Sequence, residues 1–227
     1  AMDPQQRMLM EVAYESLESA GLPRENLAGS SVGVFVASSS FDYSHRVLSD
    51  INAIDAYGIT GNFHCFLANR LSFLFNFRGP SLALDTACSS SLVAVHLAVR
   101  ALRNRDCDLA LAGGVNTLIA PETMVALSNW GMLSPDGSCK TFDSGANGFV
   151  RAEGCGVIVL KRLADALAEN DTVLAVIRGT AVNQDGRSTV ITAPNGMAQR
   201  AVLKQALADA LVEPEQISAI EAHGTGT

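Results

Sequence analysis

Cys88 is the residue whose type and position point most directly to covalent chemistry. It lies in the stretch Asp85-Thr86-Ala87-Cys88-Ser89-Ser90-Ser91, where an apolar strand pattern stops and an apolar helical pattern starts. A thiol at the first turn of a helix faces unpaired backbone N–H groups and the positive end of the helix dipole, and both favour the thiolate. Cys88 is therefore a candidate nucleophile. The alternative is that Cys88 is a small buried hydrophobic residue, as intracellular cysteines commonly are.

A cysteine nucleophile needs a histidine that manages protons or developing negative charge, and the chain has four. His223 is favoured because it follows a short strand pattern and precedes Gly-Thr-Gly-Thr, and sites in α/β folds are assembled at strand ends. His96 lies on the same helical pattern as Cys88, about two turns further on. We interpret His96 as a core histidine with a satisfied hydrogen bond. His45 and His64 precede any clear motif and are expected to be structural.

The elements on either side of Cys88 would hold it in place. Ser81–Leu84 is a short apolar run after Gly79-Pro80, which predicts a buried strand. Residues 92–102 are apolar almost all the way round, which predicts a helix enclosed by protein on every side.

The rest of the chain alternates between helical and strand patterns. The strand pattern at 108–115 ends in Gly113-Gly114, where a backbone must come close to another group. This alternation predicts an α/β architecture with buried sheets and at least one helix layer between them. No G-x-G-x-x-G motif follows a strand pattern, so the dinucleotide-binding fingerprint is missing. Further strands are predicted over 31–38, 149–160, 173–181 and 217–221, and further helices over 3–20, 63–75, 121–131, 163–169 and from residue 195 onward.

Composition narrows the classes of function. With 227 residues, 48% of them hydrophobic and 17% charged, the chain can form one large core or two modest ones. A net charge of −7 without a lysine or arginine cluster argues against nucleic acid or an anionic membrane as partner. The five cysteines form no C-x-x-C pair, so neither a disulfide framework nor a metal site is predicted, and a reducing, cytoplasmic location is expected. No apolar run of spanning length and no signal peptide is present.

Two motifs together resemble the β-ketoacyl synthase domain of modular type I polyketide synthases: DTACSSS at 85–91 and EAHGTGT at 221–227. The segments AMDPQQR at 1–7, GNFHCFLANRLSFLFNFRGPS at 61–81 and GMLSPDGSCKTFD at 131–143 agree as well. The resemblance implies a thiolase-like α/β fold of five layers, αβαβα, built from two similar halves. This chain would cover most of the N-terminal half and the start of the C-terminal half. We interpret residues 1–227 as a partial ketosynthase domain, truncated at both ends, without a linker or second domain.

The resemblance also implies roles for individual residues. Cys88 would accept the acyl chain as a thioester, and its backbone N–H would donate to an oxyanion. His223 would stabilise the charge that develops on the malonyl thioester carbonyl as carbon dioxide leaves. Thr225 and Thr227 would hydrogen-bond the phosphopantetheine arm. The alternative is that these two hydroxyls satisfy a tight turn.

Three apolar residues, Met132, Leu133 and Phe142, are candidates for lining an acyl pocket. All three are explained equally well as ordinary core residues.

The implied activity is decarboxylative Claisen condensation of an enzyme-bound acyl thioester with a malonyl or substituted malonyl carrier protein, in polyketide chain extension. No cofactor would bind directly, because the substrates arrive on the phosphopantetheine arm of an acyl carrier protein. Acyl carrier protein and acyltransferase domains are the expected partners, together with a second copy in a homodimer of the full-length protein. The 227 residues alone are expected to be inactive.

Two alternatives remain open at this point. The family's second histidine and its lysine would lie beyond Thr227, so a non-elongating module that only holds acyl chains fits the same motifs. A thiolase, which condenses acyl-CoA without decarboxylation, is the other alternative.

Overall fold

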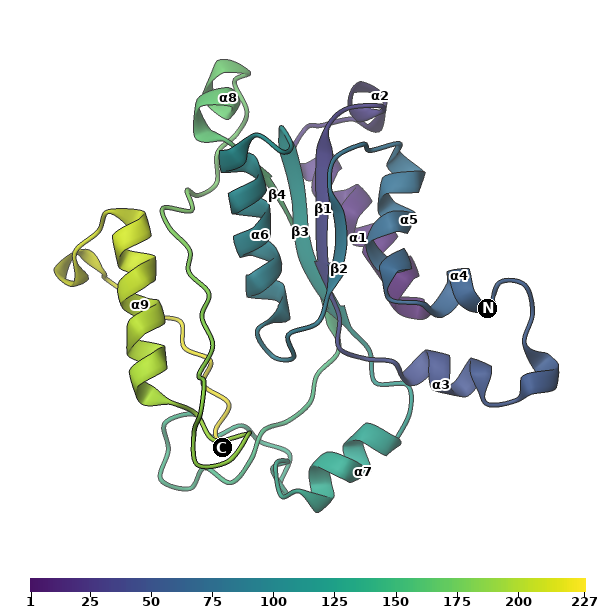
Figure 1. The fold of residues 1–227 in the computed structure, drawn as a ribbon, viewed down its shortest axis with the longest axis vertical. Helices are drawn as coiled ribbons and strands as arrows, with labels where there is room; N and C mark the ends of the chain where they lie inside the picture. Colours follow the sequence, from purple (N-terminus) through teal and green to yellow (C-terminus); the bar gives the residue numbers. More distant parts are fainter.

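A four-stranded mixed sheet organises the fold in the computed structural model, which describes residues 1–227 (Figure 1). Its strand order is β2-β1-β3-β4, in which β1 (Val32–Ala37) pairs in parallel with β2 (Ser81–Leu84) and with β3 (Leu109–Asn116). The last strand, β4 (Gly154–Lys161), runs antiparallel to β3. Every residue of β1 is buried, as expected for a central strand covered on both faces.

Helices cover both faces of this sheet. On one face α1 (Pro4–Ser19) packs against β3 and β4 and α5 (Cys65–Phe75) packs against β1 and β2, whereas α6 (Ser90–Asn104) covers the other face (Figure 1). Asp3 caps α1 by accepting a hydrogen bond from Gln5 N–H at 2.8 Å. Two apolar clusters result, one on each side of the sheet. The α1 and α5 side includes Leu9, Leu71, Phe75, Val34 and Leu111, and the α6 side includes Ala94, Ala98, Leu102, Phe35 and Ala112.

The remaining elements are short or lie outside the sheet. None of the helices combines the length and the apolar character needed to cross a membrane. The elements outside the sheet and its covering helices are α2 (Arg24–Leu27), α3 (Asp42–Leu48), η1 (Ile51–Ala53), α4 (Gly58–Asn62), α7 (Glu122–Asn129), α8 (Leu163–Ala168), α9 (Gly196–Ala210) and η2 (Pro214–Gln216).

Two predicted strands are wrong. Residues 173–181 and 217–221 carry no regular secondary structure, although both have β-branched strand patterns. A strand is defined by hydrogen bonds to a neighbouring strand, and neither segment has one here. The first segment instead lies between α6 and α9, where Arg103 donates to the Arg178 carbonyl at 2.9 Å (Figure 1).

The prediction that α6 is enclosed on every side is also wrong. Its alanines pack on the sheet, but the Leu92 side chain is 75% exposed. The face away from the sheet has polar contacts instead: Arg103 pairs with Asp209 of α9 at 2.8 Å. A sequence pattern shows that a helix face is apolar, whereas the tertiary structure decides which segments reach that face.

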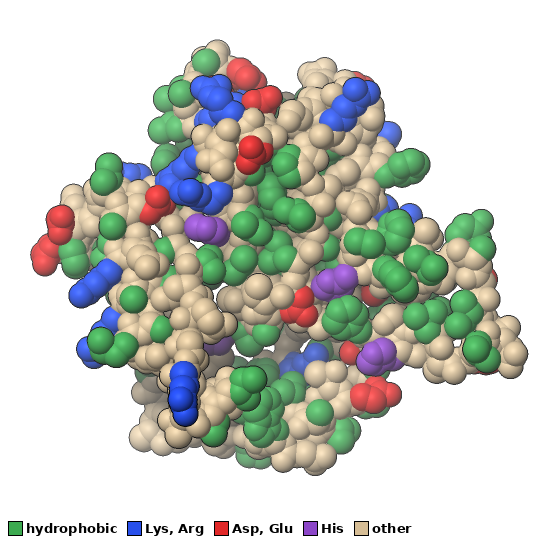
Figure 2. Space-filling model, in the orientation of Figure 1, with side chains coloured by type: hydrophobic (Ala, Val, Ile, Leu, Met, Phe, Trp, Pro, Cys, Tyr) green, Lys and Arg blue, Asp and Glu red, His purple; other side chains and the backbone are tan.

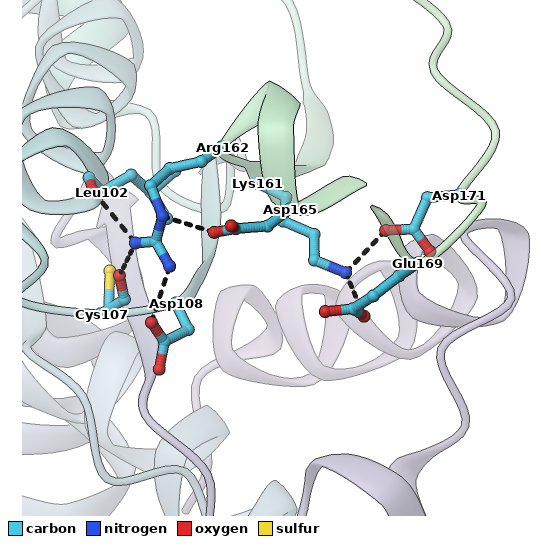
Figure 3. Close-up of polar contacts among 8 residues, drawn as sticks. All are labelled: Leu102, Cys107, Asp108, Lys161, Arg162, Asp165, Glu169 and Asp171. Atoms are coloured by element: carbon cyan, nitrogen blue, oxygen red, sulfur yellow. Dashed lines mark hydrogen bonds and ion pairs between the residues drawn. The ribbon is translucent and has the colours of Figure 1, made fainter. Parts of the chain in front are cut away.

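Arg162, directly after β4, contacts the last turns of α6 and the residues just before β3 (Figure 3). Its guanidinium donates to the carbonyls of Leu102 and Cys107, at 3.1 and 2.8 Å, and pairs with Asp108 at 2.7 Å. These contacts hold the loop between α6 and β3 against the end of β4. The neighbouring Lys161 pairs with Asp171 at 2.7 Å, which ties the residues after α8 to the end of β4.

Candidate active site

Cys88 lies in the turn that connects β2 to α6. The strand ends at Leu84 and the helix begins at Ser90, with Ser89 as its N-cap residue. Cys88 is thus one residue before the cap, and its side chain is exposed. The alternative that Cys88 is a buried hydrophobic residue is therefore wrong, and the thiol is available to a substrate at the positive end of a 15-residue helix.

Asp85 organises this turn from the strand side. One of its carboxylate oxygens, Oδ1, accepts hydrogen bonds from the Ser39 hydroxyl at 2.6 Å and from Ala87 N–H at 2.8 Å. Ser39 follows β1, so the contact joins the ends of two neighbouring strands. The Ser39 hydrogen bond, helped by the Ala87 N–H, lowers the pKa of Asp85 below its ordinary value, so this carboxylate is ionised at neutral pH.

Ser90 holds the same turn from the helix side. Its hydroxyl accepts from Thr86 N–H at 2.8 Å and donates to the Ala87 carbonyl at 2.6 Å. Between these two anchors, Ala87 adopts a φ of 55°, in the left-handed region that alanine rarely occupies. The residue directly before the thiol is thus held in an unfavourable conformation by side-chain hydrogen bonds.

His64 lies near Asp85 and is half-buried. Its ring stacks on Phe41 with a centroid separation of 4.7 Å. Burial lowers the pKa of His64, an effect that the negative charges of Asp85 and Asp3 partly offset. The imidazole Nε2 is buried and has no hydrogen-bond partner.

A cavity of about 420 Å³ adjoins His64 and is lined mainly by apolar side chains. The buried Oδ1 of Asn62, which also lines it, has no hydrogen-bond partner either. The sequence patterns did not indicate this cavity. Its lining residues are Phe41, Ser44, Leu48, Asn62, Phe63, His64 and Cys65.

His223 is exposed and lies in the C-terminal segment 222–227, which packs on the loop at 139–148. Thr141 donates to the Gly224 carbonyl, and Gly148 N–H donates to the Gly226 carbonyl at 3.1 Å. Gly226 has a φ of 76°, and a Cβ there would lie 2.9 Å from Lys140 N, so glycine is required. This segment and the β2–α6 turn lie towards the same end of the molecule (Figure 1), but no hydrogen bond joins His223 to Cys88.

The two threonines of this segment contact each other. Their hydroxyl oxygens, Thr225 Oγ1 and Thr227 Oγ1, are 2.8 Å apart. Both hydroxyls keep further hydrogen-bonding capacity, because each has one donor and two lone pairs.

The other histidines lie away from the turn. His96 Nδ1 is 2.8 Å from Thr180 Oγ1, and burial together with the nearby Arg100 lowers the pKa of His96. The predicted satisfied hydrogen bond is thus confirmed, although the side chain is half-buried rather than in the core. His45 is exposed on α3.

The three candidate pocket residues differ in burial. Met132 and Leu133 are half-buried, and the Phe142 side chain is 88% exposed. The interpretation of Phe142 as an ordinary core residue is therefore wrong. Its backbone also lies in the left-handed region, with a φ of 63°.

Sequence reasoning missed Ser39, Asp85 and Ala87 as site residues. An aspartate that accepts from the N–H two residues later is a common turn motif, so Asp85-Thr86-Ala87 carried a usable signal. No sequence signal pointed to Ser39, because its contact with Asp85 spans 46 positions along the chain. The left-handed conformation of Ala87 had no sequence signal either.

An exposed cysteine in the turn between β2 and α6 places the chain among α/β proteins whose sites lie at strand ends. The chain belongs to the β-ketoacyl synthase family: residues 1–166 match the model of its N-terminal domain, and residues 174–227 match that of its C-terminal domain. The resemblance read from the motifs is thus confirmed.

Relatives agree with the family. The chain is 55% identical, over its whole length, to a phenolphthiocerol/phthiocerol polyketide synthase protein of Mycobacterium tuberculosis (strain CDC 1551 / Oshkosh) and covers 12% of that protein. It is also 55% identical to another component of the same synthase from that strain, of which it covers 15%. The chain therefore spans a small part of the curated relatives that it matches.

Two solved ketosynthases superpose on the whole chain. An oxazolomycin ketosynthase domain from Streptomyces albus JA3453 gives a TM-score of 0.94 at 42% identity, with 39% of that chain covered. The ketosynthase from module 6 of the bacillaene synthase of Bacillus subtilis 168 gives 0.90 at 42% identity, with 38% covered. The thiolase-like fold class is confirmed by these neighbours, and this chain contributes one sheet of that fold.

Proposed function

We propose that residues 1–227 form part of a ketosynthase domain that catalyses decarboxylative Claisen condensation during polyketide chain extension. The observation that carries the proposal is an exposed cysteine in the β2–α6 turn of a chain that belongs to the β-ketoacyl synthase family. In the first step the Cys88 thiolate attacks an acyl thioester on a carrier protein. The acyl–sulfur bond to the carrier breaks, the carrier sulfur leaves as a thiolate, and the acyl group is held on Cys88.

Cys88 is suited to this step by its place before α6. The positive end of the helix dipole stabilises the oxyanion of the tetrahedral intermediate. The backbone N–H of Cys88 is the proposed oxyanion donor, and one preorganised donor of this kind contributes about 3 kcal/mol to transition-state stabilisation.

His223 is proposed to act in the second step. The malonyl group loses carbon dioxide, and the electron pair of the broken carbon–carbon bond forms an enolate whose oxygen accepts a hydrogen bond from the imidazole. The enolate carbon then attacks the acyl carbonyl on Cys88. A new carbon–carbon bond forms, and the Cys88 thiolate leaves.

The substrates would arrive on the phosphopantetheine arm of an acyl carrier protein, loaded by an acyltransferase domain. Thr225 and Thr227 are the proposed contacts for that arm, because both hydroxyls retain unused hydrogen-bonding capacity. Met132, Leu133 and Phe142 are proposed to line the acyl pocket, and the exposure of Phe142 is compatible with contact to an acyl chain.

A homodimer of the full-length protein is also proposed. Strand β2 lies at one edge of the sheet, and the exposed Leu82 side chain marks it as an edge that a second copy can cover. All five cysteines are free, which supports a reducing, cytoplasmic location.

The test uses the full-length protein that contains this sequence, incubated with an acyl thioester and malonyl carrier protein. Mass spectrometry measures acyl groups on Cys88 and the β-ketoacyl product. We expect C88A to lose both, because no nucleophile remains. H223A should keep the acyl-enzyme and lose product by about 10²-fold or more, the usual scale for a group that stabilises or transfers charge in the transition state. C139S, which removes another exposed thiol and keeps a hydrogen-bond acceptor for Val150 N–H, is the matched control and should behave as wild type.

Three outcomes would contradict the proposal. Acylation of wild-type Cys88 without any condensation product would indicate the non-elongating module. Acetoacetyl-CoA formed from acetyl-CoA without malonate would indicate a thiolase. Acylation of C88A equal to wild type would remove Cys88 from the mechanism.

A further inference from the structure

The Ala87 conformation needs an explanation, because it precedes the nucleophile. A φ of 55° brings the alanine Cβ close to its own backbone, and a free turn would leave this region. The structure offers two sets of contacts that oppose such a relaxation. One is the Ser90 hydroxyl, which bonds the Thr86 N–H and the Ala87 carbonyl. The other is Asp85.

Asp85 acts on Ala87 directly and is itself oriented. The oxygen that accepts the Ala87 N–H also accepts the Ser39 hydroxyl. The N–H fixes the peptide plane before Ala87, and Ser39 fixes the carboxylate relative to the end of β1. The turn is therefore anchored to the neighbouring strand rather than only to its own helix.

We propose that Asp85, oriented by Ser39, is a positioning residue that holds Ala87 in its left-handed conformation and thereby sets the direction of the Cys88 thiol. The inference rests on the proposed role of Cys88 as nucleophile. Asp85 hydrogen-bonds Ser39 and Ala87 N–H rather than the thiol, so its proposed effect passes through the backbone of Ala87.

The hydrogen-bond acceptor of Asp85 can be separated from its charge by substitution. The proposed contribution comes from the acceptor, because Asp85 Oδ1 is the atom that accepts the Ala87 N–H. Asparagine keeps that acceptor and removes the charge, whereas alanine removes both.

The experiment measures the rate of Cys88 alkylation by iodoacetamide in the full-length protein, with each modified cysteine identified by peptide mass spectrometry. We expect D85A to slow alkylation of Cys88 about tenfold, the scale of one net hydrogen bond. D85N should react at least about fivefold faster than D85A, because its amide oxygen still accepts from Ala87. The double variant D85A/A87G should recover most of the lost rate, because glycine adopts a positive φ without strain. A87G alone shows how the glycine substitution changes the alkylation rate of Cys88 while Asp85 is still present.

Cys139 serves as the internal reference, since it is exposed and lies outside the turn. Its alkylation rate should not change in any variant. S39A provides a second route that leaves Asp85 in place, and we expect it to slow Cys88 by about two- to fivefold through loss of one oriented hydrogen bond. If D85A does not fold, S39A and its partner S39A/A87G decide the question by the same comparison.

The proposal is overturned if D85A or S39A leaves Cys88 as reactive as wild type, or if D85N is as slow as D85A. It is also overturned if D85A/A87G alkylates Cys88 as slowly as D85A does. Alkylation requires neither carrier protein nor malonate. Failure of the condensation assay therefore leaves this measurement intact, and the two proposals can fail separately.

Discussion

At the scale of single residues, the five cysteines show how strongly local surroundings change the exposure and the pKa of chemically identical side chains. Cys65, Cys88 and Cys139 are exposed, whereas Cys107 is buried beside Gly33 and Cys155 is half-buried on β4. Burial raises the pKa of Cys107 and raises that of Cys155 to about 11, from an ordinary value of 9.0. The sequence alone ranked none of these except Cys88.

Cys155 is predicted to resist alkylation at neutral pH. A pKa of about 11 leaves a thiolate fraction about 100-fold smaller at pH 8 than a pKa of 9.0 would, and the thiolate is the reactive form. Iodoacetamide labelling followed by peptide mass spectrometry should therefore modify Cys139 long before Cys155. Equal rates at the two positions would contradict this prediction.

The same shift predicts the pH dependence of stability. Because the pKa of Cys155 is raised in the folded state, its contribution to the free energy of unfolding is fully present below pH 9 and is lost as the pH rises from 9 towards 11. The difference in unfolding midpoint between wild type and C155A should therefore shrink across that interval. A difference that stays constant from pH 8 to pH 11 would count against the raised value.

At the scale of elements, the centre of the sheet depends on a close approach between two strands. Gly113 of β3 faces β4, and a Cβ at this position would collide with the Gly156 carbonyl. The sequence prediction that the backbone comes close to another group at Gly113-Gly114 is thus confirmed. It did not indicate which group, because β4 pairs with β3 across an intervening segment of more than 35 residues.

G113A is predicted to destabilise the sheet. Relieving the collision requires β3 and β4 to separate, and overpacking of this kind costs about 1–3 kcal/mol. Hydrogen exchange of β3 amides in the full-length protein measures the loss as faster exchange. G154A is the matched control on the neighbouring strand, because a Cβ there meets no atom within 4 Å. It should change stability by less than about 0.5 kcal/mol, and equal effects of the two substitutions would contradict the explanation.

At the scale of the whole molecule, a large apolar surface lies outside the two core clusters. Figure 2 shows apolar side chains gathered over α3, α4 and α7. Others lie on the segments after β4, where the Leu174 and Ile220 side chains are 92% and 84% exposed. Exposed apolar side chains gathered in this way mark regions that other protein surface covers.

Residues 1–227 produced alone are therefore predicted to be inactive and to associate. The exposed apolar side chains should bind a hydrophobic dye such as ANS and drive self-association on size-exclusion chromatography. The full-length protein at the same molar concentration is the reference and should bind less dye per chain. A monodisperse, monomeric peak with a sharp thermal transition for residues 1–227 would contradict this prediction.

Local patterns in the sequence were enough to determine the secondary structure nearest the site. The cap at Asp3, the strands at 31–38, 81–84 and 108–115, and the helix after Cys88 are encoded within a few residues of themselves, through capping side chains, β-branched runs and helical periodicity. The DTACSSS and EAHGTGT motifs likewise indicated the family before any contact was known.

Contacts between distant segments decided the rest. The segments at 173–181 and 217–221 read as strands but have no strand to pair with, and the apolar helix α6 is only partly covered. The turn around Cys88 is held by Ser39, and the end of β4 is held by an arginine that reaches two carbonyls about 55 to 60 positions away. The sequence determined the fold family and the candidate residues for the chemistry, because residue type and local spacing are local properties. Only the tertiary structure decided how those residues are held, because a hydrogen bond depends on which groups the fold brings within reach.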